Sequence, residues 1–539
     1  MTIENSLAYN MIQRVNVGDF LTRSAARAPN SDAVIDGERR FTYIEFERYA
    51  NRIANGLSEK GYNKGDVLAL ISENSAEFLA IYFACAKIGV VCLPINLFLE
   101  SGEIVYVLNH SEAKGAVVTQ SLLVKYKAGF ERSSTLIDIM VVGESEGGNE
   151  DFKPILTSRF NIIEFSLLHE KQSDLVPHVE IEDRAPITYL YTSGTTSAPK
   201  GVVGSHLAIY IETLGTAIDT RMTASDRTVA MLPMFHTAQL NALCTPIFSV
   251  GGAVVVMKGF DVEELRDKIE SEKITVLFGL PMMYRALVEA QLSKPRNIDS
   301  LRLAVYAMAT MPDTELRQGI DTLKCDFSLM FGQTEMSPTA TFFRPEHQLS
   351  HPGAVGTPSI NVQVGIMDPE GNLLPQGQEG EIVYRSPQVL TCYLKNDDAT
   401  REAFKFSWFH SGDTGYFDQD GILWFKDRFK DVIKSGGENV ASLEVEKAIY
   451  EVDSSIDEVA VIGLPHQKWT EAITAVVTLR NDGSFDESKF NERLRNNLSP
   501  FKCPKGIIVV DSMPKTATGK IQKAELRKIH NDYYKENLE

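Results

Sequence analysis

The chain has 539 residues, too many for a single hydrophobic core, so a large domain with subdomains and at least one further domain is expected. Hydrophobic residues make up 43% of the sequence and charged residues 23%, which is ordinary for a soluble globular protein. The net charge of −18 argues against a basic nucleic-acid-binding face, and no nucleic-acid partner is expected.

The N-terminal stretch MTIENSLAYNMIQRVNV lacks the apolar core of a signal peptide. No run of about 18 apolar residues occurs further along, so no transmembrane segment is expected. The 6 cysteines are scattered without a C-x-x-C pair, which fits a reducing compartment better than a disulfide framework or a zinc site. We therefore expect a soluble cytoplasmic protein.

Apolar β-branched runs alternate with helical patterns through most of the chain, which predicts a layered α/β fold. AEFLAIYFACAKIG is predicted to be a helix that ends at its glycine. Strands are predicted, in chain order, in DVLALIS, VVCLP, KGAVVT, IDIMVVG, GGAVVVM and ITVLFGLP.

After about residue 380 the pattern changes to short strands separated by turn residues, which indicates a small β region. From about residue 431 a compact tail follows, with a helix in SLEVEKAIYEV, strands in EVAVIGLP and AITAVVTL, and a last helix. The charged run KDRFKDVIK interrupts the strand pattern. We place the boundary there, between an N-terminal domain of residues 1–429 and a C-terminal domain of residues 430–539.

The stretch YTSGTTSAPKGV, residues 191–202, combines hydroxyls and glycines with a lysine. It is not a Walker loop, because Lys200 is preceded by Pro199 and followed by Gly201. Strand patterns flank it on both sides, in PITYLY and GVVGS. Such a loop can offer backbone N–H groups and hydroxyls to phosphate oxygens, with Lys200 as a point charge, or it can be a solvated turn.

The blocks that follow favour the phosphate loop. YTSGTTSAPKG resembles the phosphate loop of the adenylate-forming superfamily, which contains acyl-CoA synthetases, peptide-synthetase adenylation domains and luciferases. The resemblance continues in order through MLPMFHTAQLN, FGQTEMSP, HSGDTGYFDQDG, KDRFKDVIKSGGENVASLEVE and PKTATGK. It implies a large N-terminal adenylation domain with layered sheets, helices and a β region. It also implies a small, mobile α+β C-terminal domain that turns about a hinge near Lys430.

The resemblance also assigns the ATP site. Phe331 is implied to stack on adenine, and Glu335 to bind the magnesium ion that accompanies ATP, since this ion prefers hard oxygen ligands. Asp413 is implied to accept bonds from both ribose hydroxyls through its two carboxylate oxygens, with Arg428 reaching the same ribose. The implied ATP-binding residues are Thr192, Ser193, Gly194, Thr195, Thr196, Lys200, Phe331, Gly332, Gln333, Thr334, Asp413, Arg428 and Lys520.

Two lysines are implied to act in different half-reactions. Lys520 would stabilise the charge that develops on the α-phosphate and the attacking carboxylate, an electrostatic effect commonly worth roughly 2.7–4 kcal/mol per donor. Lys434 would serve thiol transfer, next to Gly436 and Gly437, whose lack of a side chain allows close backbone approach to coenzyme A. With Glu335, these lysines are the implied catalytic residues.

The acyl pocket is the part that the sequence defines least. His236, in MLPMFHTAQLN, is implied to form the wall between the acyl and nucleotide pockets, although a core histidine is the alternative. Met308 is implied to line the far end of the acyl pocket, with packing in the core or against adenine as the alternative. Met308 and Thr310 replace a usual small Gly-Ala-Pro run, and Ser197 replaces a usual glycine in the phosphate loop.

These observations predict an ATP-dependent acid–CoA ligase with Mg²⁺ and coenzyme A. The carboxylate forms an acyl-adenylate and diphosphate, and the thiol of coenzyme A then displaces AMP. A fatty acid of medium or long chain is the favoured substrate, with an aryl acid as runner-up. A stand-alone enzyme that loads a carrier protein is an alternative. A binding protein that has lost catalysis is disfavoured because Lys520, Glu335 and Asp413 are present. The sequence leaves a homodimer open.

Overall fold

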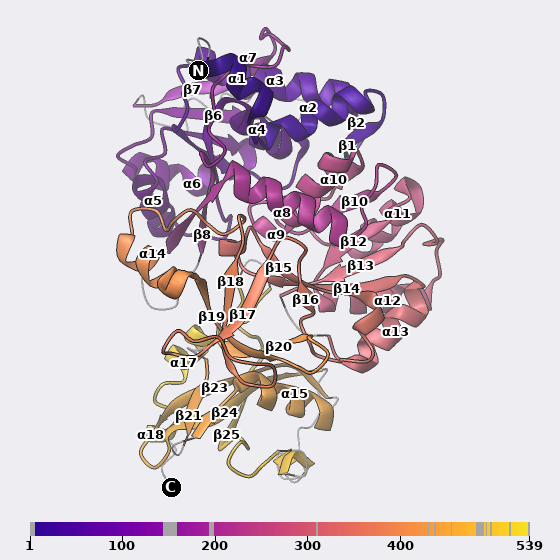
Figure 1. The fold of residues 1–539 in the computed structure, drawn as a ribbon, viewed down its shortest axis with the longest axis vertical. Helices are drawn as coiled ribbons and strands as arrows, with labels where there is room; N and C mark the ends of the chain where they lie inside the picture. Colours follow the sequence, from indigo (N-terminus) through magenta and orange to yellow (C-terminus); the bar gives the residue numbers. More distant parts are fainter. Residues whose placement is uncertain are drawn as a thin grey trace. The chain divides into compact units, whose positions relative to one another are not determined.

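The computed structural model describes residues 6–143, 159–192, 199–308, 311–428, 431–435, 438–453, 455–480, 490–491, 493–495, 498–516 and 519–536. The chain forms two compact units, one of residues 1–363 with 384–404 and one of residues 364–383 with 405–539. The predicted mixed α/β fold is confirmed (Figure 1). The second unit begins before the boundary at 429/430 expected from the sequence. Lys430 lies outside the described residues, so its role as a hinge stays a prediction.

The first unit contains a seven-stranded sheet with the order β7-β6-β5-β3-β4-β8-β9. Its first six strands are parallel to their neighbours, and β9 returns antiparallel to β8. Every residue of β3 and β4 is buried, which explains why both appear in the sequence as continuous apolar runs. The strands are β3 (Val67–Ile71), β4 (Val91–Pro94), β5 (Gly115–Thr119), β6 (Asp138–Val142), β7 (Asn161–Glu164), β8 (Pro186–Thr192) and β9 (Lys200–Ser205).

A nine-stranded sheet in the same unit has the order β16-β15-β14-β13-β12-β10-β11-β1-β2. Its centre is parallel, while β15 pairs antiparallel with β14. The FGQTE motif therefore spans the end of β14 and the start of the connection to β15. The strands are β1 (Asp32–Asp36), β2 (Arg39–Thr42), β10 (Arg227–Ala230), β11 (Ala253–Val256), β12 (Val276–Gly279), β13 (Leu303–Tyr306), β14 (Asp326–Gly332), β15 (Thr339–Phe343) and β16 (Thr357–Pro358).

Helices surround these sheets. The longer ones are α2 (Gly18–Arg27), α3 (Tyr43–Glu59), α4 (Ala76–Ile88), α5 (Ser101–His110), α6 (Gln120–Arg132), α8 (His206–Asp219), α11 (Val262–Glu272), α12 (Pro281–Ser293) and α13 (Asp313–Leu323). The shorter ones are α1 (Ser6–Gln13), α7 (Phe165–His169), α9 (Thr237–Gln239), the π-helix η2 (Leu240–Cys244), α10 (Thr245–Val250), the 3₁₀ helices η3 (Thr334–Met336) and η4 (Pro345–His347), and α14 (Asp397–Ala403). Helix α4 is buried all round and ends at Gly89, whose φ of 72° explains the glycine there.

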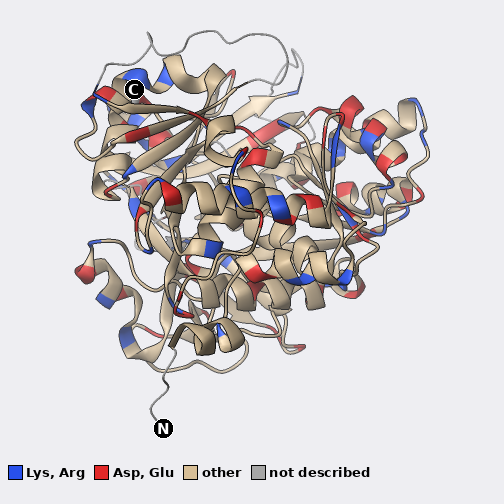
Figure 2. Cartoon of the chain, turned by 90° about the horizontal axis from the view of Figure 1, so that it is seen from above, with Lys and Arg blue, Asp and Glu red and all other residues tan. Residues whose placement is uncertain are grey.

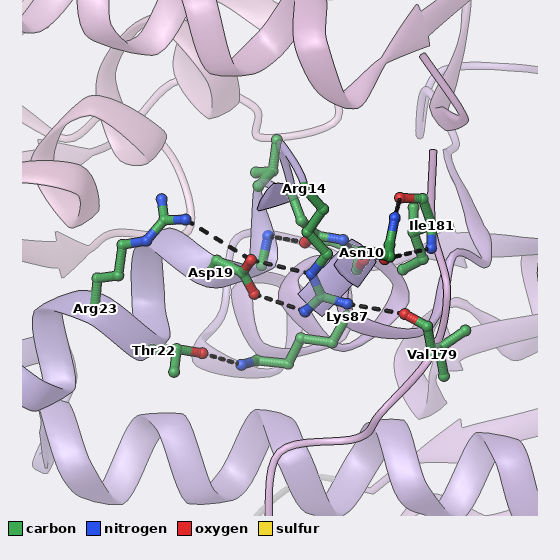
Figure 3. Close-up of polar contacts among 12 residues, drawn as sticks. Asn10, Arg14, Asp19, Thr22, Arg23, Lys87, Val179 and Ile181 are labelled. Atoms are coloured by element: carbon green, nitrogen blue, oxygen red, sulfur yellow. Dashed lines mark hydrogen bonds and ion pairs between the residues drawn. The ribbon is translucent and has the colours of Figure 1, made fainter. Parts of the chain in front are cut away.

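A polar cluster anchors the N-terminal segment of the first unit (Figure 3). The Arg14 guanidinium lies 2.8 Å from the Asp19 carboxylate and donates to the Val179 carbonyl oxygen at 2.9 Å. Nearby, the buried Lys87 ammonium lies 2.9 Å from the Glu47 carboxylate and donates to the Thr22 hydroxyl at 2.7 Å. Burial lowers the pKa of Lys87, and the charge of Glu47 opposes that shift. Buried charges of this kind are retained when they are paired.

The second unit is built largely on two smaller sheets, one of β17-β18-β19-β20 and one of β22-β21-β24-β23 with β25 on β24. Asp418 and Gly421 form a turn between β19 and β20, with the Gly421 N–H donating to the Asp418 carbonyl at 3.1 Å. The elements are β17 (Gln363–Met367), β18 (Gly380–Arg385), η5 (Lys405–Ser407), β19 (Phe409–Phe417), β20 (Leu423–Arg428), β21 (Ile433–Ser435), β22 (Glu438–Val440), α15 (Ser442–Val452), β23 (Ile456–His466), β24 (Thr470–Leu479), β25 (Gly506–Val509), α17 (Lys523–Ile529) and α18 (Tyr533–Glu536).

Acidic and basic residues are interspersed along the helices and loops (Figure 2). This mixture shows how a chain with a net charge of −18 still carries local cations that can meet anionic groups. Within the described ranges, no helix combines the length and the apolar character needed to span a bilayer.

Candidate functional site

The phosphate-loop motif connects two paired strands. Thr192 ends β8 and Lys200 begins β9, and the two residues are partners in the antiparallel register. The strands predicted in PITYLY and GVVGS are thus confirmed. Ser193, Gly194, Thr195, Thr196 and Ser197 lie outside the described residues, so their phosphate-binding role stays a prediction. The two ends of the loop are held opposite each other by backbone hydrogen bonds.

One edge of β9 pairs with β8, and its other edge pairs with residues 391–394, a segment that follows β18. The Thr391 N–H donates to the Val203 carbonyl at 2.9 Å, and the Leu394 N–H donates to the Gly201 carbonyl at 2.8 Å. This pairing holds Tyr393 beside the start of β9, where the Lys200 ammonium lies 4.7 Å from the centre of the tyrosine ring. An aromatic face at this distance attracts a cation.

Tyr393 also contacts the predicted metal-binding carboxylate. Its hydroxyl donates to Glu335 Oε1 at 2.9 Å. Burial raises the pKa of the Tyr393 phenol, and the charge of Glu335 raises it further, so the hydroxyl keeps its proton and remains a donor. The structure therefore brings together Lys200 and Glu335, both named from the sequence, through a residue that the sequence analysis missed. No local motif marks Tyr393, because its place depends on pairing between distant segments.

The Glu335 turn is fixed by its backbone. The Gln333 N–H donates to the Pro338 carbonyl at 3.0 Å, and the Leu390 N–H donates to the Glu335 carbonyl at 2.7 Å. A side chain at Gly332 would place its Cβ 2.0 Å from the Pro338 carbonyl oxygen, so only glycine fits there. Phe331 precedes it at the end of β14 and is half-buried. The FGQTE motif is thus a tight turn that presents Glu335.

The surroundings of Glu335 fit a magnesium ion that arrives with ATP. The side chain is half-buried, and its second carboxylate oxygen is hydrogen-bonded to no residue in the described part of the chain. In the same part of the chain, no group of three or more His, Cys, Asp or Glu side chains could hold a metal. Magnesium is commonly held by one or two carboxylates together with substrate phosphates and water, and this arrangement matches that pattern.

His236 and Met308, the predicted acyl-pocket residues, are both half-buried. His236 caps α9, with its Nδ1 accepting from the Ala238 N–H at 3.2 Å, and burial lowers the pKa of its imidazole to about 4. The ring is therefore neutral at neutral pH. Met308 follows β13 with a φ of 69°, a left-handed backbone that is uncommon for a residue with a side chain. Thr310 lies outside the described residues.

In the second unit, the two predicted ribose-binding residues are partners. Asp413 on β19 and Arg428 on β20 are opposite each other in the antiparallel register. The Arg428 Nε lies 3.2 Å from Asp413 Oδ1, and Asp413 is 5% exposed. The Ser411 hydroxyl oxygen accepts from the Asp413 N–H at 3.0 Å. The sequence named both residues but did not predict that they would form an ion pair.

The two predicted catalytic lysines lie on separate parts of the second unit, and both are exposed. Lys434 lies on β21, where its N–H donates to Glu471 Oε2 at 2.7 Å. Lys520 follows Gly519, whose φ is 78°, and its N–H donates to the Thr516 hydroxyl at 3.1 Å. Gly436 and Gly437 lie outside the described residues.

A further surface feature of the second unit was not identified from the sequence. The Trp469 ring is half-buried, with the Lys468 ammonium 4.8 Å and the Lys505 ammonium 5.2 Å from its centre. An aromatic face with two cations can stack on a base and attract phosphate groups. Lys468 precedes Trp469 directly, but the approach of Lys505 depends on the fold.

Comparison with known proteins identifies relatives along the whole chain. The AMP-binding enzyme family matches residues 21–394, and the AMP-binding enzyme C-terminal domain matches residues 444–520. The chain is 30% identical to a feruloyl-CoA synthase of an Amycolatopsis species, over 95% of this chain and 98% of that protein. It is 32% identical to a long-chain-fatty-acid–CoA ligase of Mycobacterium tuberculosis, again over 95% and 98%. The crystal structure of ATP-bound MatB from Rhodopseudomonas palustris matches with a TM-score of 0.87 and 27% identity, covering 97% of this chain and 100% of that one.

Proposed function

The chain belongs to the AMP-binding enzyme family of AMP-forming acid–thiol ligases, and on that premise we propose that it activates a medium- or long-chain fatty acid with ATP and transfers the acyl group to coenzyme A. The observation that carries the proposal is the arrangement of Lys200, Tyr393 and Glu335. The Lys200 ammonium and the Glu335 carboxylate both contact the side chain of Tyr393, which supports a role for Lys200 at the phosphates and for Glu335 at magnesium.

In the first half-reaction, an oxygen of the substrate carboxylate attacks the α-phosphorus of ATP. A bond forms between that oxygen and phosphorus, the bond to the bridging oxygen breaks, and diphosphate leaves. Lys200 attracts the phosphates, and Glu335 would hold a magnesium ion, whose positive charge would offset the negative charge of the phosphates. Asp413 and Arg428 orient the ribose, Phe331 stacks on adenine, and Lys520 stabilises the charge on the α-phosphate.

In the second half-reaction, the sulfur of coenzyme A attacks the carbonyl carbon of the acyl-adenylate. A carbon–sulfur bond forms, the carbon–oxygen bond to AMP breaks, and the thiol proton is released. Lys434, Gly436 and Gly437 are proposed to line the approach of the thiol, after the C-terminal domain turns at Lys430. Trp469 and its two lysines suit the adenine and phosphates of coenzyme A, because they offer a stacking face and cations.

The acyl pocket lies, in this proposal, between His236 and Met308. The neutral imidazole of His236 suits a wall that separates apolar substrate from nucleotide. A flexible methionine at the far end can lie along an alkyl chain, which favours a fatty acid. An aryl acid is the second candidate, because one relative is named for a fatty acid and another for ferulate.

A panel of acids, from acetate to palmitate and including benzoates and cinnamates, tests this proposal. Release of AMP and diphosphate is measured with free coenzyme A and, separately, with a carrier protein as acceptor. Highest kcat/KM for medium or long alkanoic acids with free coenzyme A supports the proposal. Activity with aromatic acids alone moves the assignment to an aryl-acid ligase, and activity with the carrier alone identifies a carrier-loading enzyme.

A further inference from the structure

A buried carboxyl group that the mechanism does not use lies on α8, beside the turn that carries Glu335. Glu212 is 1% exposed. Its Oε1 accepts from the Thr216 hydroxyl at 2.8 Å and from the Thr339 hydroxyl at 3.1 Å. Its Oε2 is equally buried and has no hydrogen-bond partner among the residues that the structure describes. Buried polar atoms in native proteins almost always have a partner, so this oxygen requires an explanation.

Glu212 lies near two elements of the proposed site, the strand that begins with Lys200 and the turn that contains Glu335. Helix α8 begins directly after β9, the strand that starts with Lys200. Thr339 begins β15, directly after the turn that contains Glu335. Glu212 thus connects α8, which follows the phosphate loop and β9, to β15, which follows the Glu335 turn.

A third element closes this region. The π-helix η2, which follows the His236-capped α9, packs on α8. On η2, Asn241 donates to the Thr237 hydroxyl at 2.9 Å and accepts from the Tyr82 hydroxyl at 3.2 Å. Burial raises the pKa of the Tyr82 phenol, so its hydroxyl keeps its proton and donates to Asn241. Such π-turns occur frequently at functional sites.

The protonation state of Glu212 determines what it can recognise. Burial raises the pKa of Glu212 to about 8, although the hydrogen bonds from Thr216 and Thr339 act in the opposite direction. At neutral pH the group is therefore mostly a neutral carboxylic acid. Because Oε1 already accepts two hydrogen bonds, the proton lies on Oε2, which then offers a donor and a remaining acceptor site.

Building on the proposed function, we propose that Glu212 is a specificity-determining residue that hydrogen-bonds a hydroxyl group on the hydrocarbon part of the acid substrate. The carboxylate of the substrate must lie at the α-phosphate, so the group that meets Glu212 belongs to another part of the molecule. A hydroxyl can accept from Oε2–H and donate in return. An unsubstituted chain or ring leaves the buried carboxyl without a partner, which penalises that substrate.

The test uses matched pairs of acids that differ by one hydroxyl, one pair aliphatic and one aromatic: ω-hydroxydodecanoate with dodecanoate, and para-hydroxycinnamate with cinnamate. The two pairs distinguish a hydroxylated fatty acid from a phenolic acid. Diphosphate release gives kcat/KM for each acid with the wild-type protein, and with Glu212→Leu and Glu212→Met. We expect the wild type to prefer the hydroxylated member of one pair by about tenfold, and both variants to reduce that ratio to about one.

Thr213→Val provides a matched control. Thr213 is the adjoining buried residue on α8, its hydroxyl has no hydrogen-bond partner in the described part of the chain, and valine has nearly the same shape. Its ratio of hydroxylated to unsubstituted acid should equal that of the wild type. Thermal melts establish that each variant is folded. The wild-type preference needs no variant, so it tests the inference even where a substitution at Glu212 prevents folding.

Two results overturn the inference alone. One is a wild type that activates acids without preferring the hydroxylated member of either pair. The other is a folded Glu212→Leu or Glu212→Met protein that keeps the wild-type ratio, which would assign Glu212 to packing or to a buried water. Failure of the wild type to release diphosphate with any acid overturns the proposed function itself, and this inference with it.

Discussion

Arg428 and Asp413 form an ion pair across β19 and β20, with the guanidinium Nε 3.2 Å from a carboxylate oxygen. In the proposed ribose site, Arg428 has two functions, because it holds the carboxylate in position and also reaches the ribose itself. The proposed recognition of ribose then depends on a geometry that neither residue could keep alone. Charge-assisted hydrogen bonds of this kind are the stronger ones in proteins.

Asp413→Asn keeps the shape of the side chain and removes its charge. The amide can present only one acceptor oxygen and cannot form an ion pair with Arg428, so we expect the KM for ATP to rise by about tenfold or more. Steady-state kinetics of diphosphate release at saturating acid measure the effect. Asp420→Asn, on the exposed turn after β19, is the control and should leave this KM unchanged. An unchanged KM in Asp413→Asn would remove the assignment to ribose.

Lys520→Ala should lower the rate of adenylate formation by a factor of about 10²–10³, the usual effect of removing one electrostatic donor. Conversion of supplied acyl-adenylate to thioester should continue near the wild-type rate. Single-turnover measurements of the two half-reactions separate these outcomes. Equal losses in both would contradict a role at the α-phosphate.

Lys434→Ala should affect the two half-reactions in the opposite way to Lys520→Ala. The rate of thioester formation from acyl-adenylate should fall much more than the rate of adenylate formation, because β21 is proposed to face the thiol only after the C-terminal domain has turned. The backbone N–H of Lys434 remains bonded to Glu471, so the strand should survive the substitution. Thiol-transfer rates that match the wild type would rule the assignment out.

Tyr393→Phe removes the hydroxyl that contacts Glu335 and keeps the ring that faces Lys200. We expect adenylate formation to fall by about two- to tenfold and to require more magnesium, since one neutral hydrogen bond contributes about 0.5–1.5 kcal/mol. Tyr393→Leu removes both contacts and should cost more. Magnesium titrations of diphosphate release measure the shift. If Tyr393→Phe and Tyr393→Leu behave alike, the hydroxyl accounts for the whole effect and the ring for none of it.

We expect His206, at the start of α8, to cause part of the pH dependence of the protein's stability. The side chain is 0% exposed, its Nδ1 accepts from the Val17 N–H at 3.2 Å, and burial lowers its pKa from 6.5 to about 3. The unfolded chain therefore binds a proton at a higher pH than the folded protein does. The contribution of His206 to the free energy of unfolding should be complete above pH 6.5. The free energy of unfolding should fall as the pH drops from 6.5 towards 3.

The slope attributable to His206 approaches about 1.4 kcal/mol per pH unit in the steepest part of this range. Denaturant unfolding at several pH values measures it in the wild type and in His206→Asn, which does not titrate. The variant should be less stable at neutral pH but show a shallower decline. Parallel curves for the two proteins would show that another group causes the acid sensitivity.

The sequence predicted best those features that depend on local pattern. Buried parallel strands such as β3 and β4 appear as continuous apolar runs, and the helix ending at Gly89 is visible from its glycine. The signature motifs also named Glu335 as a candidate metal-binding residue. Tyr393, Glu212 and Trp469 could not be found in this way. Their importance arises when β9 pairs with residues 391–394, when α8 packs beside β15, and when Lys505 approaches the indole.

Strand β9 has a neighbour on each edge, β8 on one and residues 391–394 on the other. One strand thus sets both the separation of Thr192 from Lys200, at the two ends of the proposed phosphate loop, and the position of the tyrosine that contacts Glu335. Under the proposed function, a substitution that shifts β9 should alter nucleotide and magnesium binding together, so changes at the two edges should combine non-additively. For protein engineering, this means that the phosphate loop and the segment around Tyr393 are better varied as one library than as two.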